Sequence, residues 1–382
     1  MIKSYSLHEY LFFLGIFFLT LQGFYIHSLG FSPFILLGIS IFIGTSIILK
    51  TGPIYLRNMD LVPIFLLSII LLIATLNSMI SGYFDIKRFV GFAIFIPLYI
   101  SLLRFKVFDP LHFLKYILII HISIFYLQFI LYYGFSIEFD PIREFTGRSQ
   151  KGWGGSYNLP YFGNIIRFGG LFNEPGSYST FVAILASLLN IKYTEHKNLI
   201  IFASISMMLS FSTFGFVFAS FLFMSILFHS KYHFKIITIF IFIFIFFAIS
   251  EYFFIRFFSG EVSGNGLEFR FELLQKVYET YFIDISYVTF FGLGFFNLNI
   301  NEMLNFDNPI NDAGLFIYIF VSMGLVGLSI FFLCTLVISR FRLSYLFPFL
   351  ILFFSKFNLA WPLFVVVLYL LTRSDKIIFS HR

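Results

Sequence analysis

Long apolar segments recur along almost the whole chain, and they constrain its fold more than any other feature. A helix needs about 20 apolar residues to cross the roughly 30 Å of hydrocarbon in a bilayer. Of the 382 residues, 59% are hydrophobic and only 12% are charged, and the mean hydropathy is +0.93. Water is therefore not the main solvent of this chain. The sequence predicts an integral membrane protein.

The apolar runs predict an all-α, polytopic fold of about twelve transmembrane helices, in a single transmembrane domain that covers residues 1–382. Two pairs of runs are short: the pair around Ser212–Gly215, and the last two runs of the chain. Each pair could be re-entrant or could be one broken span. The expected range is therefore about ten to twelve spans. The expected helices are Leu11–Leu29, Pro33–Leu49, Leu61–Ile80, Phe89–Leu103, Leu114–Tyr133, Pro175–Ile191, Leu199–Phe211, Phe214–Phe228, Ile236–Phe254, Ala313–Ile338, Leu343–Phe354 and Trp361–Leu371.

Positive charges are unevenly distributed between the expected short loops. If the N-terminus is cytoplasmic, the outer short loops carry only Lys87, Arg88 and Lys356. The positive-inside rule therefore places both termini in the cytoplasm. The net charge of +6 thus reflects membrane topology, and no nucleic-acid partner is expected. The inner short loops carry eleven positive residues, namely Lys50, Arg57, Arg104, Lys106, Lys115, Lys192, Lys197, Lys231, Lys235, Arg340 and Arg342.

Two long segments, residues 134–172 and 256–311, interrupt the alternation of helix and short turn. With this topology both are large periplasmic loops, and 14 of the 19 acidic residues lie on the outer side. Long loops on a compact scaffold commonly carry function. Any chemistry is therefore expected to face outward.

The second loop contains the pattern of an amphipathic helix. Its apolar residues, from Leu267 to Tyr281, recur at spacings of four and three. Glu272 and Lys276 lie four residues apart on the polar side, which predicts an ion pair. A helix lying on the membrane surface is the simplest interpretation.

The segment Arg167-Phe-Gly-Gly-Leu-Phe-Asn-Glu174-Pro175-Gly176 leads directly into an expected helix. Pro175 suits the first helical turn, where Asn173 or Glu174 could cap the free amides. Arg167 is more informative, because an arginine at the edge of an apolar bundle needs a carboxylate, a carbonyl or an anionic ligand to offset its desolvation. The helix start also presents N–H groups that suit a phosphate.

A second group of residues comprises Arg270, Gly292-Leu-Gly294 and the segment from Asp307 to Gly314. Each part is weak alone, since Asn311 or Asp312 could be a simple helix cap. Gly-Leu-Gly is not a nucleotide-binding fingerprint, because no strand precedes it and no third glycine follows.

Taken together, these segments resemble the O-antigen polymerase (Wzy) family, which is related to the O-antigen ligases. In that group an arginine, a nearby glycine and a proline-containing helix start follow the first large outer loop, as do Arg167, Gly170 and Glu174-Pro175 here. The segment Leu209–Gly215 looks like the serine-rich helix break of the family.

The second group of residues extends this resemblance. Arg270 and the pair Gly292 and Gly294 look like the arginine of the second outer loop and its downstream glycines. Asp312–Gly314, followed by Gly324 and Gly327, resembles the aspartate-rich start of a glycine-bearing helix. The match spans residues 167–327, under half of the chain.

The resemblance implies a glycosyltransferase of the bacterial inner (cytoplasmic) membrane. On the periplasmic face it would polymerise oligosaccharide repeat units linked to undecaprenyl pyrophosphate into O-antigen or a related surface polysaccharide. The donor and the acceptor are then both lipid-linked glycans in the membrane, and a chain-length regulator is a conceivable further partner. Arg167 and Arg270, with Arg256 third, are expected to bind the pyrophosphate leaving group. Glu174 or Asp312 would accept the proton of the attacking hydroxyl.

No Asp-x-Asp motif or histidine cluster is present in the outer loops, so neither a metal nor another cofactor is expected. Ligases of this group carry a histidine in the second outer loop. The corresponding residues 256–311 contain none, which favours a polymerase over a ligase.

Three other functions remain open. A lipid-linked oligosaccharide flippase or another transporter is the main alternative, although the expected midplane is nearly free of charge. An O-antigen ligase comes next. An outward-facing acyltransferase usually has a histidine inside the membrane, for which only His121 is available.

Overall fold

The computed structural model is built of helices, with one short hairpin. It describes residues 6–26, 32–48, 56–82, 84–105, 109–151, 157–159, 163–191, 196–229, 239, 243, 247, 252, 268–283, 285–297, 310, 314–355 and 357–379. The all-α prediction is confirmed for these residues except at the antiparallel pair β1 (Tyr157–Leu159) and β2 (Gly163–Ile165). The longer helices are α1 (Leu7–Thr20), α2 (Pro33–Ile48), α3 (Asn58–Ile80), α5 (Phe95–Arg104), α6 (Pro110–Phe135), α8 (Pro175–Asn190), α9 (Lys197–Leu209), α10 (Thr213–His229), α12 (Glu268–Tyr278), α15 (Leu315–Ser339), α16 (Leu343–Phe354) and α17 (Leu363–Phe379). The shorter ones are α4 (Ile86–Ala93), α7 (Pro141–Thr146), the π-helix η2 (Glu279–Ile283) and α13 (Tyr287–Phe291).

Nine of the expected apolar helices coincide with observed ones to within four residues at each end, although Phe89–Leu103 is divided into α4 and α5. The expected Leu11–Leu29 is wrong at its end, because α1 stops at Thr20, and α17 continues to Phe379, beyond the expected end at Leu371. The twelfth, Ile236–Phe254, lies outside the described residues except at four positions. Among the described residues, four helical stretches are long and apolar enough to cross a membrane, namely Asn58–Ile80, Ile86–Arg104, Pro110–Phe135 and Leu315–Ser339. Six further apolar helices are shorter. These helices indicate a membrane protein, while the number of about twelve spans and the placement of the loops stay predictions.

The chain divides into two compact units. Unit 1 comprises residues 1–16, 39–108 and 266–382, and unit 2 comprises residues 17–38 and 109–265. The division passes through α1 and α2. The expectation of a single transmembrane domain stays a prediction.

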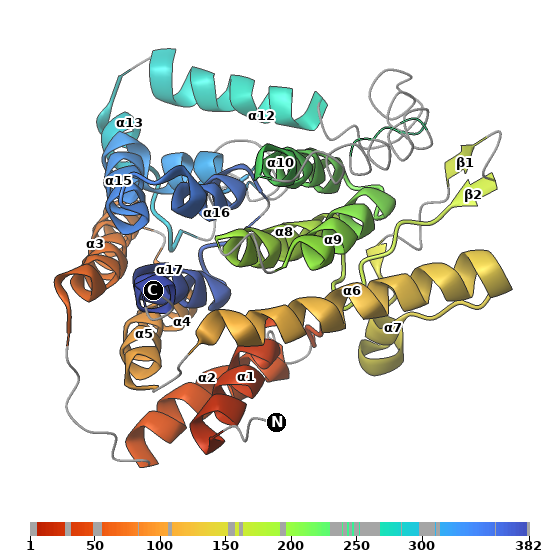
Figure 1. Ribbon diagram of the computed structural model, residues 1–382. Helices are drawn as coiled ribbons and strands as arrows, with labels where there is room; N and C mark the ends of the chain where they lie inside the picture. The colour runs from red at the N-terminus through yellow and green to blue at the C-terminus, as the bar shows by residue number, and fades with distance from the viewer. Residues whose placement is uncertain are drawn as a thin grey trace. The chain divides into compact units, whose positions relative to one another are not determined.

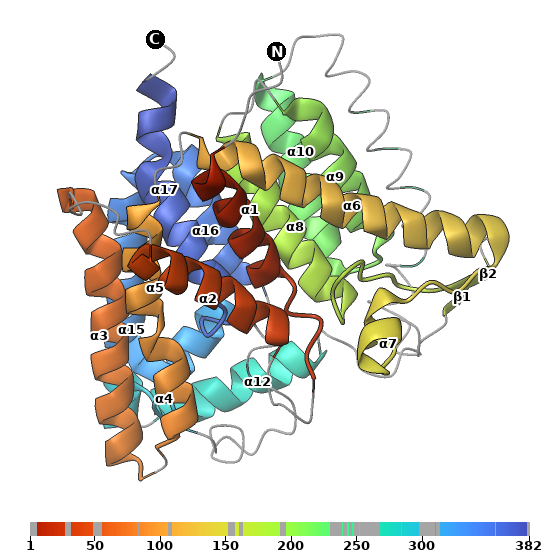
Figure 2. The ribbon, with the colours of Figure 1, turned by 90° about the horizontal axis from the view of Figure 1, so that it is seen from below.

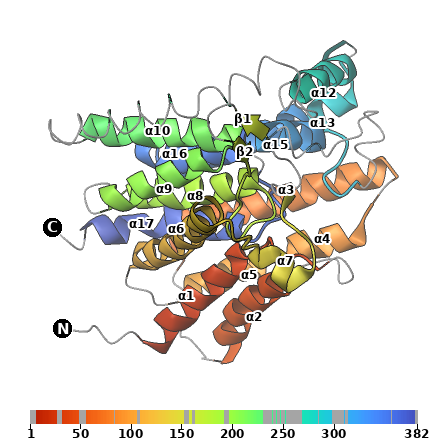
Figure 3. The same ribbon diagram turned by 90° about the vertical axis from the view of Figure 1, so that its right-hand side faces the viewer.

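Helix α8 is the centre of unit 2. From Tyr178 to Leu189 every side chain is buried, because α8 packs against α6, α9 and α10. Figure 1 shows α8, α9 and α10 side by side in green, and Figure 3 shows α6 next to α8 and α9. A helix that is apolar or small on all sides can be enclosed in this way. Its first turn, at Pro175, is therefore fixed by the rest of the unit.

The serine-rich segment between α9 and α10 is a helix break, as its sequence predicts. Phe211 has a left-handed φ of +51°, so the chain reverses there. The hydroxyl of Ser210 lies 2.9 Å from that of Ser179 on α8. A side chain at Gly215 would collide with the carbonyl of Met207, so only glycine allows this close approach.

In unit 1, α15 packs along α3, as Figure 2 shows on its left-hand side. Helix α15 is interrupted at Gly324, where φ is +62° and the backbone is not helical. The carbonyls of Val321 and Ser322 accept hydrogen bonds of 2.9 Å from the N–H groups of Leu293 and Gly294. The glycine turn after α13 therefore supplies donors to carbonyls at the break.

Polar side chains hold the same turn from other directions. The amide of Asn77 on α3 donates to the carbonyl of Phe291, and its oxygen accepts from Tyr287 at 2.7 Å. Ser78 accepts from the N–H of Phe296 at 3.0 Å. Tyr281 donates to the carbonyl of Val321 at 2.7 Å, and burial raises the pKa of this phenol, which keeps it a neutral donor.

Candidate functional site

Arg167 lies in a stretch of backbone that is held on its N-terminal side by α6. The N–H of Ile166 donates to the phenol oxygen of Tyr133 at 3.1 Å, and the same oxygen lies 3.4 Å from the carbonyl of Ile166. Ile166 and Phe168 are buried, whereas Arg167 is half-buried. The arginine is thus the partly exposed residue between two buried neighbours.

Two buried glutamines hold the glycine pair on the C-terminal side of Arg167. The side chain of Gln128 on α6 accepts from the N–H of Gly170 at 2.9 Å and donates to the carbonyl of Phe139 at 3.0 Å. Gln150 donates to the carbonyl of Gly170 at 2.7 Å and accepts from the N–H of Gly169 at 3.4 Å. Both polar groups of Gly170 therefore have an amide partner, which fixes the backbone just after Arg167.

The conformation of Gly170 gives a physical reason for a glycine at this position. Its φ is +58°, in the left-handed region. A side chain there would also lie 3.2 Å from the ring of Tyr178 on α8. The loop therefore lies directly against the central helix of unit 2.

Asp140 fixes the other end of the loop. This carboxylate is 1% exposed and accepts from the N–H groups of Ile142 and Arg143, so it caps α7. It also accepts from the N–H of Gln150 at 2.8 Å. One buried acid thus connects α7 to the glutamine that binds the glycine pair.

Glu174 forms an ion pair with Lys151. Glu174 is the N-cap residue of α8, but its side chain makes no capping hydrogen bond, so the cap interpretation of its carboxylate is wrong. The N–H of Lys151 also donates to the carbonyl of Asn173 at 2.9 Å. The carboxylate is 21% exposed and the ammonium is 66% exposed, which leaves the pair accessible from outside unit 2.

His121 on α6 is fully buried and packs against the Arg167–Gly176 segment. The hydroxyl of Thr20 lies 2.6 Å from the carbonyl of Phe17 and 2.8 Å from Nε2 of His121, so it hydrogen-bonds to the buried imidazole. Its ring packs against Phe172 with the centroids 5.1 Å apart. His121 supports the Arg167–Gly176 segment from within the unit.

The remaining predicted site residues belong to unit 1. Arg270 lies in α12, where the structure describes its backbone but not its side chain. Arg256 and Asp312 lie outside the described residues. That these residues share one site with Arg167 and Glu174 stays a prediction.

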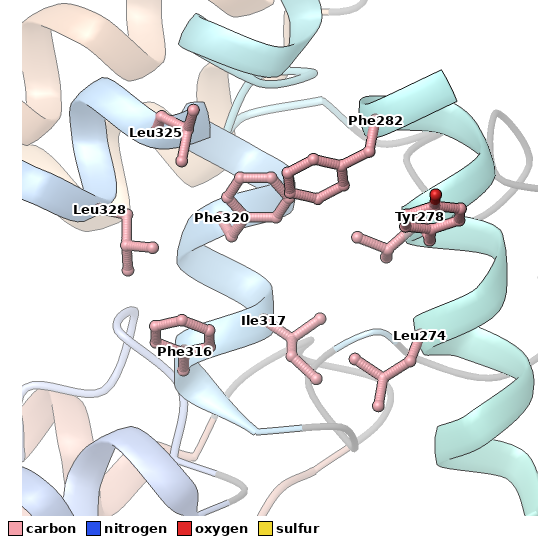
Figure 4. A pocket seen from close by; sticks show the side chains of 9 residues that line it. Leu274, Tyr278, Phe282, Phe316, Ile317, Phe320, Leu325 and Leu328 are labelled. Carbon is pink, nitrogen blue, oxygen red and sulfur yellow. The ribbon is translucent and has the colours of Figure 1, made fainter. Parts of the chain in front are cut away.

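Helix α12 itself confirms two expectations. It forms where the apolar spacing predicts a helix, and Lys276 contacts Glu272 at 3.0 Å. Its apolar side faces α15 across a groove of about 310 Å³. Leu274, Tyr278 and Phe282 lie on one side of this groove, and residues of α15 on the other (Figure 4). The lining is apolar throughout, so the groove suits a hydrocarbon chain.

Several residues that organise the site were not predicted from the sequence. Gln128 carries a signal, because a lone amide inside an apolar run needs a partner. Asp140 carries another, because Asp-Pro is a typical helix start. Gln150 and Lys151 lie in a polar loop, and nothing in the sequence distinguishes them from their neighbours. Among the residues the structure describes, no three His, Cys, Asp or Glu side chains group as metal ligands would.

Comparison with models of protein families, with curated proteins and with solved structures gives no match to this chain. The resemblance to O-antigen polymerases therefore rests on the motifs of the sequence and stays a prediction.

Proposed function

We propose that this protein is a membrane glycosyltransferase that lengthens a bacterial surface polysaccharide, using undecaprenyl pyrophosphate-linked glycans as donor and acceptor. The observation that carries the proposal is the fixed backbone around Arg167. Tyr133 holds one side, and Gln128 and Gln150 hold the other. A guanidinium presented by a preorganised backbone can stabilise charge without reorganising during the reaction.

In the proposed reaction, a hydroxyl at the non-reducing end of the acceptor attacks the first sugar of the donor chain. A new C–O bond forms while the bond from that sugar to pyrophosphate breaks, and undecaprenyl pyrophosphate leaves with the bonding electrons. Arg167 and Arg270 bind the pyrophosphate most strongly when its charge is fully developed. Arg256 is a third candidate for this role.

The proton of the attacking hydroxyl passes to a carboxylate, either Glu174 or Asp312. Glu174 is bound to Lys151, so it must be released from the ammonium before it can accept a proton. The approach of a pyrophosphate offers such a release, because Lys151 can then bind the anion. This exchange assigns Lys151 a part in substrate binding that the sequence does not indicate.

The apolar groove beside α12 supports a lipid-linked substrate. Arg270 belongs to the same helix whose apolar side lines the groove. A polyprenyl chain in the groove would bring its pyrophosphate to the end of the hydrocarbon region, where the charged residues of the loops are expected.

The test is a polymerase assay on purified variants with a synthetic lipid-linked repeat unit. Arg167→Ala combined with Arg270→Ala should abolish chain extension. Arg167→Lys alone should lose much of the activity, because lysine lacks the bidentate fork. The matched control, Arg143→Ala with Arg148→Ala, removes the same charge from exposed positions of the first loop and should remain active. Near wild-type activity of the first double variant would refute the proposal.

A transporter is the second candidate, and the break in α15 is the observation that favours it, because broken helices line the substrate sites of many transporters. Here, however, the carbonyls of Val321 and Ser322 are bound by Leu293 and Gly294. Cells that lack a polymerase should still attach single repeat units to lipid A, whereas cells that lack a flippase should attach none. Gel analysis of their lipopolysaccharide separates the two functions.

A further inference from the structure

The turn between η2 and α13 in unit 1 leaves large apolar side chains exposed. Ile283 is 61% exposed and Ile285 is 72% exposed. Phe290, on α13, is exposed as well. Contact of such a surface with water is unfavourable, and exposed apolar patches commonly mark contacts with a membrane or with another protein. An apolar partner is therefore expected to cover this turn.

Hydrogen bonds to α3 set the level at which the turn lies. The amide of Asn77 donates to the carbonyl of Phe291, and its oxygen accepts from the hydroxyl of Tyr287 at 2.7 Å. Asn77 is buried, and it lies three residues before Ile80, the last residue of α3. Three residues correspond to about 4.5 Å along a helix axis. Helix α13 is therefore held at the level of the last turn of α3.

Helix α3 is long and apolar enough to cross a membrane, and one of its faces is exposed along its whole length. The large apolar residues of this face recur at helical spacings of four, seven, four and three, and they are Leu61, Phe65, Leu72, Leu76 and Met79. Such a face on a membrane-spanning helix contacts lipid. The turn after η2 thus lies at the level where a lipid-facing surface ends.

We propose that this turn is embedded in the membrane leaflet at the end of α3, with Ile283, Ile285 and Phe290 in contact with lipid acyl chains. The positive-inside rule predicts that this is the outer leaflet. In the sequence Asp284 and Ser286 alternate with the isoleucines, which favours the boundary between headgroups and acyl chains over the bilayer core. Lipid is favoured over a protein partner, because the exposed face of α3 that ends at this level is expected to contact lipid.

The embedded turn also gives the groove between α12 and α15 an opening. Phe282 precedes the exposed isoleucines and lines the groove, where its ring stacks on that of Phe320 with the centroids 5.6 Å apart (Figure 4). The groove then opens toward acyl chains at the same depth, so that a hydrocarbon chain can enter it from the side. The contact with lipid is independent of glycosyl transfer.

The test is electron paramagnetic resonance of the full-length protein in nanodiscs, with one spin label at a time in a variant whose single cysteine is replaced, Cys334→Ser. Oxygen is concentrated among acyl chains and a nickel chelate in water, so their collision rates with the label report its depth. A label at Ile285→Cys should collide mainly with oxygen, at a depth of about 5–10 Å. Leu76→Cys is the reference in lipid and Arg148→Cys the reference in water. The matched control is Glu279→Cys, an exposed polar position of η2, which should collide mainly with the chelate.

Two results would overturn the proposal. Frequent collisions of the Ile285 label with the nickel chelate would place the turn in water. Few collisions with either reagent would show that protein covers the residue, either a second copy of the chain or another partner.

A second measurement requires no variant. The wild-type protein is reconstituted with a phospholipid that carries a diazirine in its acyl chain, illuminated and digested. Crosslinks are expected on the peptide that contains Ile283 and Ile285 as well as on peptides of α3. Crosslinks on α3 without any on this peptide would contradict the proposal.

Discussion

At the scale of single residues, the amide groups of Gln128 and Gln150 account for the position of Arg167. They bind both polar groups of Gly170 in a site from which water is excluded. A buried backbone group that loses its partner costs about 1–3 kcal/mol. The conformation of the loop is therefore determined by side chains on α6 and in the loop itself. That conformation in turn sets the position of the Arg167 backbone.

Gln128→Leu tests this arrangement. The substitution leaves the N–H of Gly170 without its partner, so the protein should lose about 1–3 kcal/mol of stability and most of the proposed polymerase activity. Gln275→Leu is the matched control, because Gln275 is an exposed amide on α12 that contacts only Glu279 in the described structure. Thermal unfolding in detergent and the polymerase assay measure the two effects. Full activity of the Gln128 variant would show that the position of Arg167 does not depend on the amide.

At the scale of elements, the break in α15 and the turn after α13 form one structure. Gly324 has a φ of +62°, and a side chain there would collide with the backbone of Phe290 and Phe291. Gly292 has a φ of +76°, and a side chain there would likewise collide with the backbone of Ser322 and Met323. Each glycine is required because two backbone segments are in contact.

Gly324→Ala should therefore detach α13 from α15. The expected result is faster hydrogen exchange over residues 285–297 and a lower unfolding temperature. Gly91→Ala in α4 is the control, because nothing lies near the added methyl group and alanine is the better helix former. If Gly324→Ala leaves hydrogen exchange in this segment unchanged, the contact is not what holds α13.

The sequence predicts such helices well but not the contacts between them. Apolar runs fixed most helix positions to within several residues, and the spacing from Leu267 to Tyr281 predicted α12 together with its ion pair. The Lys151–Glu174 pair and the hydrogen bonds of Gln150 join residues about 20 positions apart in an irregular loop. No periodicity specifies such contacts, because they depend on how the loop packs against α6 and α8. The hairpin β1–β2 lies in the same loop and was not predicted from the sequence.

At the scale of the whole molecule, the proposed reaction requires a particular topology. The positive-inside rule predicts that the Arg167 loop lies outside and that the turn between α15 and α16 lies in the cytoplasm. Cys334 is the single cysteine of the chain, and it is buried. A Cys334→Ser variant therefore has no native thiol, and a reporter cysteine can be introduced at a chosen position. In intact cells, a cysteine at Arg148 should react with an impermeant maleimide, and one at Lys197 should react only after permeabilisation. The reverse pattern would place the site on the cytoplasmic side and contradict the proposed reaction.

The proposed reaction requires Arg167 and Arg270 to contact one pyrophosphate. Spin labels at Arg167→Cys and Arg270→Cys, in the Cys334→Ser background, allow their separation to be measured by pulsed electron resonance in nanodiscs. The account predicts a single narrow distance, short enough for one pyrophosphate to contact both positions. A long separation that no bound diphosphate could bridge would contradict it.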